Sequence, residues 1–430
     1  MIASILAIII FFIVYIFLLT EKLDRALIAG TGGVLMFVAG IYDINKGFQQ
    51  YIDWNTIALL LAMMILVSIT SRTGVFEYTA IKMGQLVNGH GAGLLIVISC
   101  FTAIGSAFLA NVTTVLLIVP VLLTITRLLQ ISAIPYLIAI IISSNIGGTA
   151  TLIGDPPNIM IGQAVKHLTF NDFLVHLAPV SFFIFVVIIS LLLFFYKDAI
   201  KVTAVNREKL SQIDAKSFVV VDATLVKALT VLIVTIAGFI FSSYLNLDLT
   251  TVALAGAVLL LLLTYKSQPP EEILRQVDWA TLFFFIGLFM LVGGLEETGI
   301  ISELSRSIVF FTEGDLPKTA LLILWMTGLF SGFVDNIPFV AAMIPVVFEF
   351  QDYGMKNLDP LWWSMALGAC LGGNGTLLGS SSNLVVAGLA AKAQEPIAFL
   401  KFLKIGMFTV MLSLAISTVY IYIRYLIPFL

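Results

Sequence analysis

Long apolar segments follow one another along most of this chain. A membrane-spanning helix needs about 20 mostly apolar residues, and windows of this kind recur with few charges inside them. They lie at residues 3–20, 26–41, 54–71, 175–196, 228–245, 251–266, 279–295 and 405–427. The pattern therefore predicts an all-α polytopic membrane protein.

Four further segments are apolar but not continuous. Segments 134–165 and 360–390 are each interrupted in the middle by glycine and polar residues. Segments 93–130 and 318–350 each read as two helices joined at a polar tip. Such a pair either enters and leaves on one membrane face or crosses twice, and the pattern alone does not separate these alternatives.

The two halves of the chain repeat one another at a constant spacing. Asp53-Trp54 recurs as Asp278-Trp279, and 278 - 53 = 225. The same offset relates Thr73-Gly74 to Thr298-Gly299, SAFLANVTTVLLIVP (106–120) to SGFVDNIPFVAAMIP (331–345), and Gly147-Gly148 to Gly372-Gly373. We predict a first repeat over 1–196, a polar linker over 197–227 and a second repeat over 228–430.

Each repeat is expected to hold about five transmembrane helices plus a re-entrant hairpin, with one broken helix. Five crossings, or seven if the hairpins cross fully, are an odd number, so the second repeat is inverted relative to the first. Under the positive-inside rule, both termini lie outside and loop 197–227 lies in the cytoplasm. This orientation puts 16 of the 22 basic residues, including Lys22, Arg25 and Lys209, in cytoplasmic connections. The expected location is the plasma membrane.

The interruptions and tips are candidate transport sites. Helices break inside a membrane only where protein or a watery cavity satisfies the freed backbone groups. Pro156 and Pro157 remove backbone donors, and Gly147, Gly148 and Gly154 permit non-helical dihedral angles. Small residues also let helices pack closely, but matching interruptions in two halves are typical of a transporter's binding site.

The predicted binding residues lie at these interruptions and tips, where amide, hydroxyl and backbone groups can replace water around an ion. They are Asn111, Thr113, Thr114, Asn145, Gly148, Thr149, Thr151, Gly154, Asp155, Asn158, Asp335, Asn336, Gly373, Asn374, Thr376, Ser380, Ser381 and Asn383.

Two carboxylates fall within this set. An ionisable residue inside a membrane indicates function, so Asp155 or Asp335 is expected to bind a proton or cation; helix capping is the alternative. By the 225 offset their counterparts are Ser380 and Ala110, so the acids are placed asymmetrically. Every Lys and Arg lies in a predicted loop or at a helix end. An anionic substrate would then depend on helix amino termini, which favours a neutral or cationic substrate.

Composition excludes several classes of protein. Of 430 residues, 60% are hydrophobic and 11% charged, against about 45–50% and about 25% in soluble domains. A net charge of -3 gives no basic excess for binding nucleic acid. The two cysteines and three histidines form no metal-binding motif, so we expect no cofactor and no firm metal site. The sequence contains no recognisable set of catalytic residues, so we do not expect an enzyme. It also contains no Walker motif, so any ATPase would be a separate subunit.

The motifs SAFLANVTTVLLIVP, SSNIGGTATLIGDPPNIMIG and SGFVDNIPF resemble those of the ion transporter superfamily, in the branch of the arsenical pump protein ArsB, the NhaD group and the melanosomal P protein. The resemblance covers nearly the whole chain. It implies a scaffold and a mobile transport domain, two re-entrant hairpins, a homodimer and an elevator-like movement. It also implies that the tips and breaks bind substrate or ions. Relatives often carry an acid where this chain has Ala110.

We therefore expect a secondary active transporter, embedded in the lipid bilayer, for a small inorganic or organic ion. The first hypothesis is proton-coupled efflux of arsenite, antimonite or a related inorganic anion. The alternative is sodium/proton antiport or sodium-coupled carboxylate or anion symport, with Na⁺ near Asn111 and Asn336. An uncoupled anion channel and an intramembrane enzyme are further alternatives.

Overall fold

The computed structural model describes residues 2–20, 23–203, 207, 210, 214–333 and 335–427. Every regular element in these ranges is a helix. Eight of these helices are long and apolar enough to cross a membrane, which confirms the predicted all-α polytopic class. Lys22, Lys209 and part of the predicted 197–227 linker lie outside the described residues.

The helices of the two halves follow one another in the same order. The first half comprises α1 (Ile2–Thr20), α2 (Arg25–Val38), α3 (Ile44–Lys46), η1 (Gly47–Tyr51), α4 (Trp54–Ser71), α5 (Val75–Leu86), α6 (Gly91–Phe108), α7 (Asn111–Leu129), α8 (Ile134–Thr149), α9 (Pro156–Ala164), α10 (Phe170–His176) and α11 (Ala178–Tyr196). After η2 (Ala215–Phe218), the second half comprises α13 (Ala223–Leu245), α14 (Leu249–Thr264), α15 (Pro270–Leu274), α16 (Trp279–Glu297), α17 (Ile300–Thr312), α18 (Leu316–Phe333), α19 (Asn336–Glu349), α20 (Asp359–Gly372), α21 (Ser381–Lys392), α22 (Phe399–Ile421) and η3 (Tyr422–Leu426).

Matching helices begin at matching residues. The starts of α4 and α16, α5 and α17, α6 and α18, α7 and α19, α8 and α20, and α9 and α21 each differ by 225, as in 279 - 54 and 381 - 156. The sequence repeat is thus a repeat of structure. Helix α13 begins at Ala223, inside the segment predicted as linker, because the Asp222 side chain caps it by accepting from Leu225 N at 3.0 Å.

Local chemistry explains why both halves form the same elements. Asp53 and Asp278 cap α4 and α16 by accepting hydrogen bonds at 3.0 Å from backbone N–H groups two or three residues ahead. Gly74 and Gly299 precede α5 and α17 with the same φ of +74°. This left-handed conformation favours glycine, so the repeated Thr-Gly pair marks a turn that both halves need.

The helix pairs α6–α7 and α18–α19 are re-entrant hairpins. Their second helices begin at Asn111 and Asn336, which are only 3% and 2% exposed. Asn111 lies against Gly148 of α8, and Asn336 lies against Asp155, just before α9. The hairpin tips therefore reach the interior depth at which the α8–α9 helix is broken.

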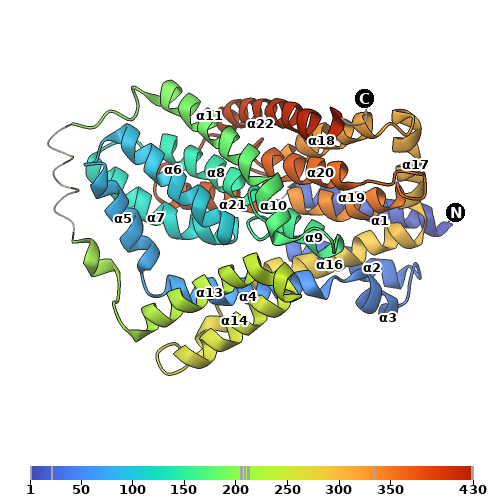
Figure 1. The fold of residues 1–430 in the computed structure, drawn as a ribbon, viewed down its shortest axis with the longest axis horizontal. Helices are drawn as coiled ribbons and strands as arrows, with labels where there is room; N and C mark the ends of the chain where they lie inside the picture. Colours follow the sequence, from blue (N-terminus) through green and yellow to red (C-terminus); the bar gives the residue numbers. More distant parts are fainter. Residues whose placement is uncertain are drawn as a thin grey trace.

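Corresponding elements lie towards opposite ends of the molecule (Figure 1). Helices α5 and α7 lie on the left of this view, whereas α17 and α19 lie on the right. Both ends of the described chain lie on the right, and the described residues that directly follow α11 lie on the left. Two inverted units produce this arrangement, as predicted.

The helices pack as two groups. Helices α1, α2, α4, α13, α14 and α16 form the scaffold group, and the two hairpins, the two broken helices, α11 and α22 form the hairpin group. Within the scaffold group, α2 packs tightly on α16, where a Cβ atom on Gly287 would lie 2.4 Å from Gly30 N. Contacts between the groups are smaller and include α16 with α19 and α4 with α9.

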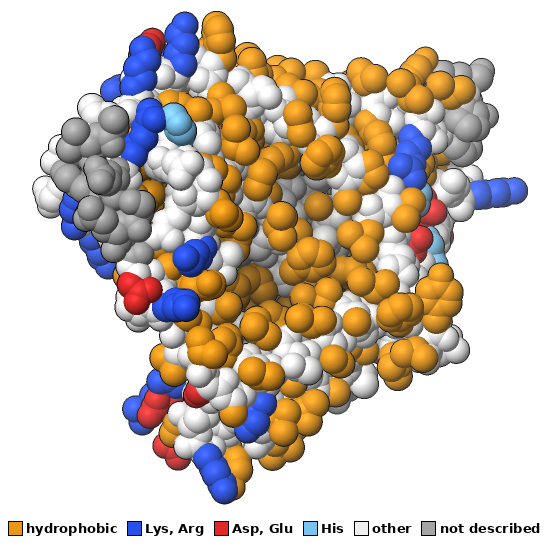
Figure 2. Space-filling view, turned by 60° about the vertical axis from the view of Figure 1, so that its left-hand side comes forward, with side chains coloured by type: hydrophobic (Ala, Val, Ile, Leu, Met, Phe, Trp, Pro, Cys, Tyr) orange, Lys and Arg blue, Asp and Glu red, His pale blue; other side chains and the backbone are white. Residues whose placement is uncertain are grey.

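The surface agrees with a bilayer environment. Figure 2 shows hydrophobic side chains over the broad middle of one face, with Lys and Arg gathered mainly at its left end. Exposed large apolar side chains are frequent on membrane-crossing helices, for example Phe182 at 69% and Phe241 at 54%. Such surface is stable only in contact with lipid or another apolar surface.

Candidate functional site

A cavity of about 490 Å³ lies between the scaffold group and the hairpin group. On the hairpin side its lining comes from the starts of four helices, α7, α9, α19 and α21. Its polar lining there is Asn111, Thr113, Asp155, Asn336, Ser380 and Ser381. Each helix start carries about half a positive charge, so four such ends give this wall a positive potential.

Asp155 is buried at the floor of this cavity. Its side chain is 2% exposed and makes no capping hydrogen bond to α9, although it occupies the position before that helix. The Asn336 amide of the second hairpin donates to its carboxylate at 3.2 Å. Because Asp155 does not cap its helix, capping does not explain why an acid is kept at this depth.

Asp335 has a different environment. One carboxylate oxygen accepts from Ile337 N at 3.3 Å and so caps α19. The other accepts from the Arg25 guanidinium, in an ion pair, and from Ser381 Oγ at 2.9 Å. Arg25 also donates to Ser381 Oγ at 3.1 Å.

The Arg25 ion pair corrects one prediction. Arg25 does lie at a helix end, as expected, but it also lines the cavity. A basic side chain, paired with Asp335, therefore lies at the candidate site, contrary to the sequence argument.

The broken helices are held open by two equivalent asparagines. Asn158 donates its amide to the carbonyl oxygens of Thr149 and Thr151 at 3.1 and 2.9 Å. Its counterpart Asn383 donates to those of Gly373 and Thr376 at 2.7 and 2.9 Å. These bonds satisfy carbonyls that the breaks leave free, so both side chains stabilise the breaks.

A third asparagine connects the two repeats. The Asn145 amide donates to Asn374 Oδ1 at 2.9 Å and to Asn383 Oδ1 at 3.0 Å. All three side chains are fully buried. The two breaks are thus fixed relative to one another behind the cavity.

The glycines of the first break lie in two settings. Gly154 lies in the non-helical segment between α8 and α9, as predicted, whereas Gly147 and Gly148 lie inside α8, which stays helical through Thr149. Gly147 and Gly148 allow close approach: a Cβ atom on Gly147 would lie 2.2 Å from Ala103 O, and one on Gly148 would lie 2.5 Å from Asn111 Oδ1. Close packing, the alternative considered for these residues, therefore explains Gly147 and Gly148.

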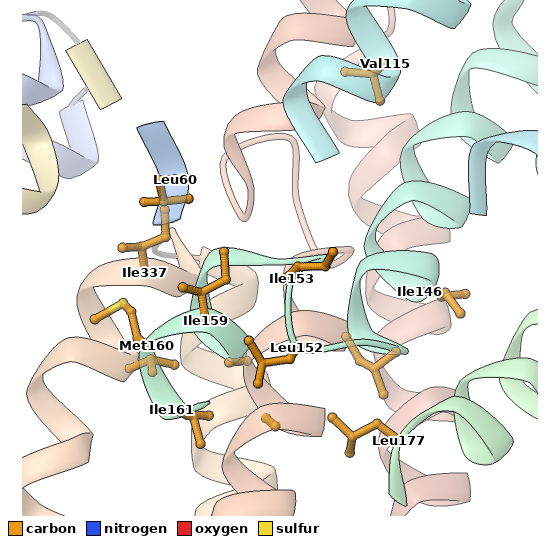
Figure 3. Packing of buried hydrophobic residues seen from close by; sticks show 14 of the residues in the cluster. Leu60, Val115, Ile146, Leu152, Ile153, Ile159, Met160, Ile161, Leu177 and Ile337 are labelled. Carbon is orange, nitrogen blue, oxygen red and sulfur yellow. The ribbon is translucent and has the colours of Figure 1, made fainter. Parts of the chain in front are cut away.

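Apolar side chains surround the break on its other sides. Figure 3 shows Leu152 and Ile153 on the segment between α8 and α9, with Ile159 on α9 to their left. All three are at most 3% exposed. The break is thus packed in protein, and its polar atoms have partners inside the fold or face the cavity.

The structure divides the predicted binding residues into two sets. Six line the cavity, as given above, and Asp335 joins them through Arg25. The others are buried behind it: Thr114, Asn145, Gly148, Thr149, Thr151, Gly154, Asn158, Gly373, Asn374, Thr376 and Asn383. Arg25 and Ser106 were not predicted; the Ser106 hydroxyl donates to Asn111 Oδ1 and holds the first tip. Direct binding by any of these residues stays a prediction.

The cavity reaches one end of the molecule. Its outer lining includes Ser71, Gln276 and Asp278. This is the end of the α11–α13 connection, because Thr73 O accepts from Val220 N at 3.0 Å. Another cavity, of about 680 Å³, is lined by residues that include Asp53 and Lys166. None of the hairpin-tip residues is part of its described lining.

Comparison with known proteins agrees with this architecture. An uncharacterized transporter of Mycobacterium tuberculosis is 38% identical over 427 residues, covering 98% of this chain and 99% of the relative. The 46 kDa membrane protein of Mycobacterium leprae is 37% identical and covers 99% of both chains. The P protein of Mus musculus is 32% identical and covers 96% of this chain but 59% of its own length.

A solved structure supports the fold. The YdaH transporter of Alcanivorax borkumensis, described as having an unusual topology, superimposes with a TM-score of 0.61 at 10% identity over 99% of both chains. The model of the citrate transporter family, CitMHS, matches residues 15–368. The resemblance to the ArsB and P protein branch is confirmed, and this multi-pass membrane transporter belongs to the citrate transporter family.

Proposed function

We propose that this protein is a secondary active transporter that moves a small anion by alternating access, coupled to H⁺ or Na⁺. The observation that carries the proposal is the cavity in which four helix starts, Arg25 and two carboxylates come together between two packing groups. Positive helix ends bind anions, and the acids supply places for a coupling cation.

The charges around the cavity favour an anion. Four helix starts sum to about +2 and Arg25 adds one charge, while Asp155 and Asp335 subtract two, leaving about +1 at the floor. Asp24 and Asp278 also line the cavity, but both are exposed and cap α2 and α16, so solvent screens them. A cation bound at either floor acid raises the balance further and strengthens anion binding, and this coupling is reciprocal.

The family name and the motifs point to overlapping substrates. The matching family is described as one of citrate transporters, which favours a carboxylate. Arsenite, antimonite and inorganic oxyanions remain candidates because the tip and break motifs resemble those of ArsB. A homodimer, with the scaffold group at its interface and the hairpin group moving in an elevator-like step, fits the two packing groups.

The test uses purified protein in liposomes that contain a pH-sensitive dye. Sodium, citrate, phosphate, arsenite and chloride are added in turn, with empty liposomes as the control. We expect one anion other than chloride to trigger cation-dependent flux. Proton flux triggered by sodium alone would overturn the anion substrate, and anion flux without any dependence on H⁺ or Na⁺ would indicate a channel or uniporter.

Sodium/proton antiport is the second candidate function. The observation that favours it is Asp155, a buried acid that accepts from the Asn336 amide and does not cap its helix. In that case the same carboxylate would bind the two cations alternately. The sodium arm of the liposome experiment separates this function from anion transport.

A further inference from the structure

Arg25, Asp335 and Ser381 form a polar triad at the cavity wall. Each side chain is hydrogen-bonded to the other two. The Arg25 side chain is 23% exposed, so solutes in the cavity can reach it, whereas that of Asp335 is 7% exposed. Arg25 belongs to α2, Asp335 directly precedes α19, and Ser381 is the first residue of α21.

The triad joins the scaffold group to the hairpin group. Helix α2 packs on α16 and α1, whereas α19 packs on α9, α17 and α20, and α21 packs on α7 and α8. Among the ion pairs between described residues, the Arg25–Asp335 pair alone connects these groups. Any movement of the second hairpin tip away from α2 must break it.

The fold does not require this pair, because the other repeat lacks it. Helices α2 and α14 each follow a capping aspartate, Asp24 and Asp248, so Arg25 corresponds to Leu249 (25 + 224). Asp335 corresponds to Ala110 (335 - 225). If the two repeats exchange conformations, as inverted repeats do in alternating access, Ala110 would face Leu249 and no ion pair would form. The pair thus stabilises only one of the two states.

Resting on the proposed function, we propose that Arg25 is the anion-recognising residue of the cavity and exchanges Asp335 for the anionic group of the substrate. Arginine binds carboxylates and oxyanions through paired N–H donors. When the anion binds the Arg25 guanidinium in place of Asp335, the ion pair between the second hairpin and α2 is broken. Asp335 keeps its bond to Ile337 N, so the start of α19 stays capped while the pair is open.

The exchange also links the anion to the coupling cation. In the observed state Arg25 neutralises Asp335. Once Arg25 binds the anion, the Asp335 carboxylate has lost its positive partner. It then lies near two other negative groups, Asp155 and the bound anion, and this arrangement is costly in a low-dielectric interior. Binding of H⁺ or Na⁺ at these acids removes that cost, so the anion and the cation bind together.

The experiment measures the accessibility of a cysteine placed on the cavity wall away from the triad. Leu117 lines the cavity, so Leu117→Cys is combined with Cys100→Ser; Cys370 is fully buried. A membrane-impermeant maleimide is applied to vesicles of known orientation. We expect Arg25→Gln and Asp335→Asn to lower the labelling rate several-fold. The exchanged pair Arg25→Asp with Asp335→Arg should bring the rate back towards the original value.

Two further comparisons make the result specific. Arg72→Gln removes a different Arg–carboxylate pair, between the end of α4 and Glu272 of α15, which packs on α4, and should leave labelling unchanged. Saturating citrate or inorganic phosphate should lower labelling of the unaltered cavity several-fold but have no effect in Arg25→Gln. Size-exclusion profiles identify any variant that does not fold, and Arg25→Lys then replaces Arg25→Gln.

The outcomes separate the inference from the proposed function. Labelling of Arg25→Gln at the unaltered rate would overturn the role of the pair. Equal anion effects with and without Arg25 would place the anion elsewhere and overturn only the inference. A third outcome is that no anion changes the labelling rate while the exchanged pair restores it. The Arg25–Asp335 pair would then stabilise the observed conformation, but Arg25 would not recognise an anion and the proposed substrate class would be wrong.

Discussion

The Asn336 amide donates a 3.2 Å hydrogen bond to the Asp155 carboxylate. Asn336 starts a helix of the second hairpin, and Asp155 precedes the second part of the first broken helix. The two inverted repeats therefore meet at this buried acid beside the cavity. Movement of the hairpin and the charge of this acid are thereby linked.

We predict that Asp155→Asn reduces cation-coupled transport about tenfold or more. The substitution keeps the size of the side chain but removes the negative charge that would hold H⁺ or Na⁺. The measurement is cation-driven uptake in proteoliposomes, with the exposed Glu313→Gln as the control acid. Uptake with an unchanged rate and pH dependence would remove Asp155 from the coupling mechanism.

Asn145→Ala should destabilise the protein without altering the cavity lining. It removes the donor to both Asn374 and Asn383 and leaves two buried oxygens with fewer partners, which costs about 1–3 kcal/mol. Thermal unfolding in detergent measures the effect. The exposed Asn357→Ala, which removes one bond to Asp359 N, should change the melting temperature far less; equal shifts would contradict the connecting role of Asn145.

Gly147→Ala should be more damaging than Gly388→Ala. A Cβ atom at 147 would lie 2.2 Å from Ala103 O, whereas one at 388 has nothing within 4 Å. Overpacking of this kind costs about 1–3 kcal/mol or more, while alanine favours the interior of α21. Folded yield and melting temperature test this contrast, and similar values for the two variants would rule out the close α6–α8 contact.

Much of the fold could be predicted because the same motifs recur at a fixed spacing in the two halves of the chain. Asp53 and Asp278, or Asn111 and Asn336, start matching elements at a fixed offset, and helix caps and tips are read from local sequence. The Arg25–Asp335 pair could not be predicted in this way. It joins residues 310 positions apart, and its position follows from how α2 packs against α16.

The sequence predicts where the candidate site lies, but it does not predict which of its residues face the cavity and which stabilise the helix breaks. Polar residues at both breaks read alike in sequence, yet Asn158 and Asn383 bond to the breaks' own carbonyls, while Asp155 faces the cavity. Gly147 and Gly148 lie inside α8 and not in the break, because composition does not separate a glycine that breaks a helix from one that allows close packing. Gly147 and its counterpart Gly372 both lie against a neighbouring helix backbone.

The orientation in the membrane is open to direct measurement. We predict that Lys201→Cys, in the exposed start of the α11–α13 connection, is labelled by an impermeant maleimide only after the cells are permeabilised. Lys356→Cys, in the exposed α19–α20 connection, should be labelled on intact cells. The reverse pattern would invert the orientation expected from the positive-inside rule and would make the cavity open to the outside.

The most direct test of the central claim is uphill transport. Proteoliposomes are loaded with equal concentrations of the active anion on both sides, and an inward gradient of H⁺ or Na⁺ is then imposed. Coupled transport predicts that the anion accumulates inside above its external concentration and that Asp155→Asn abolishes this accumulation. An internal concentration that never exceeds the external one, with either cation gradient and at zero membrane potential, would contradict the account.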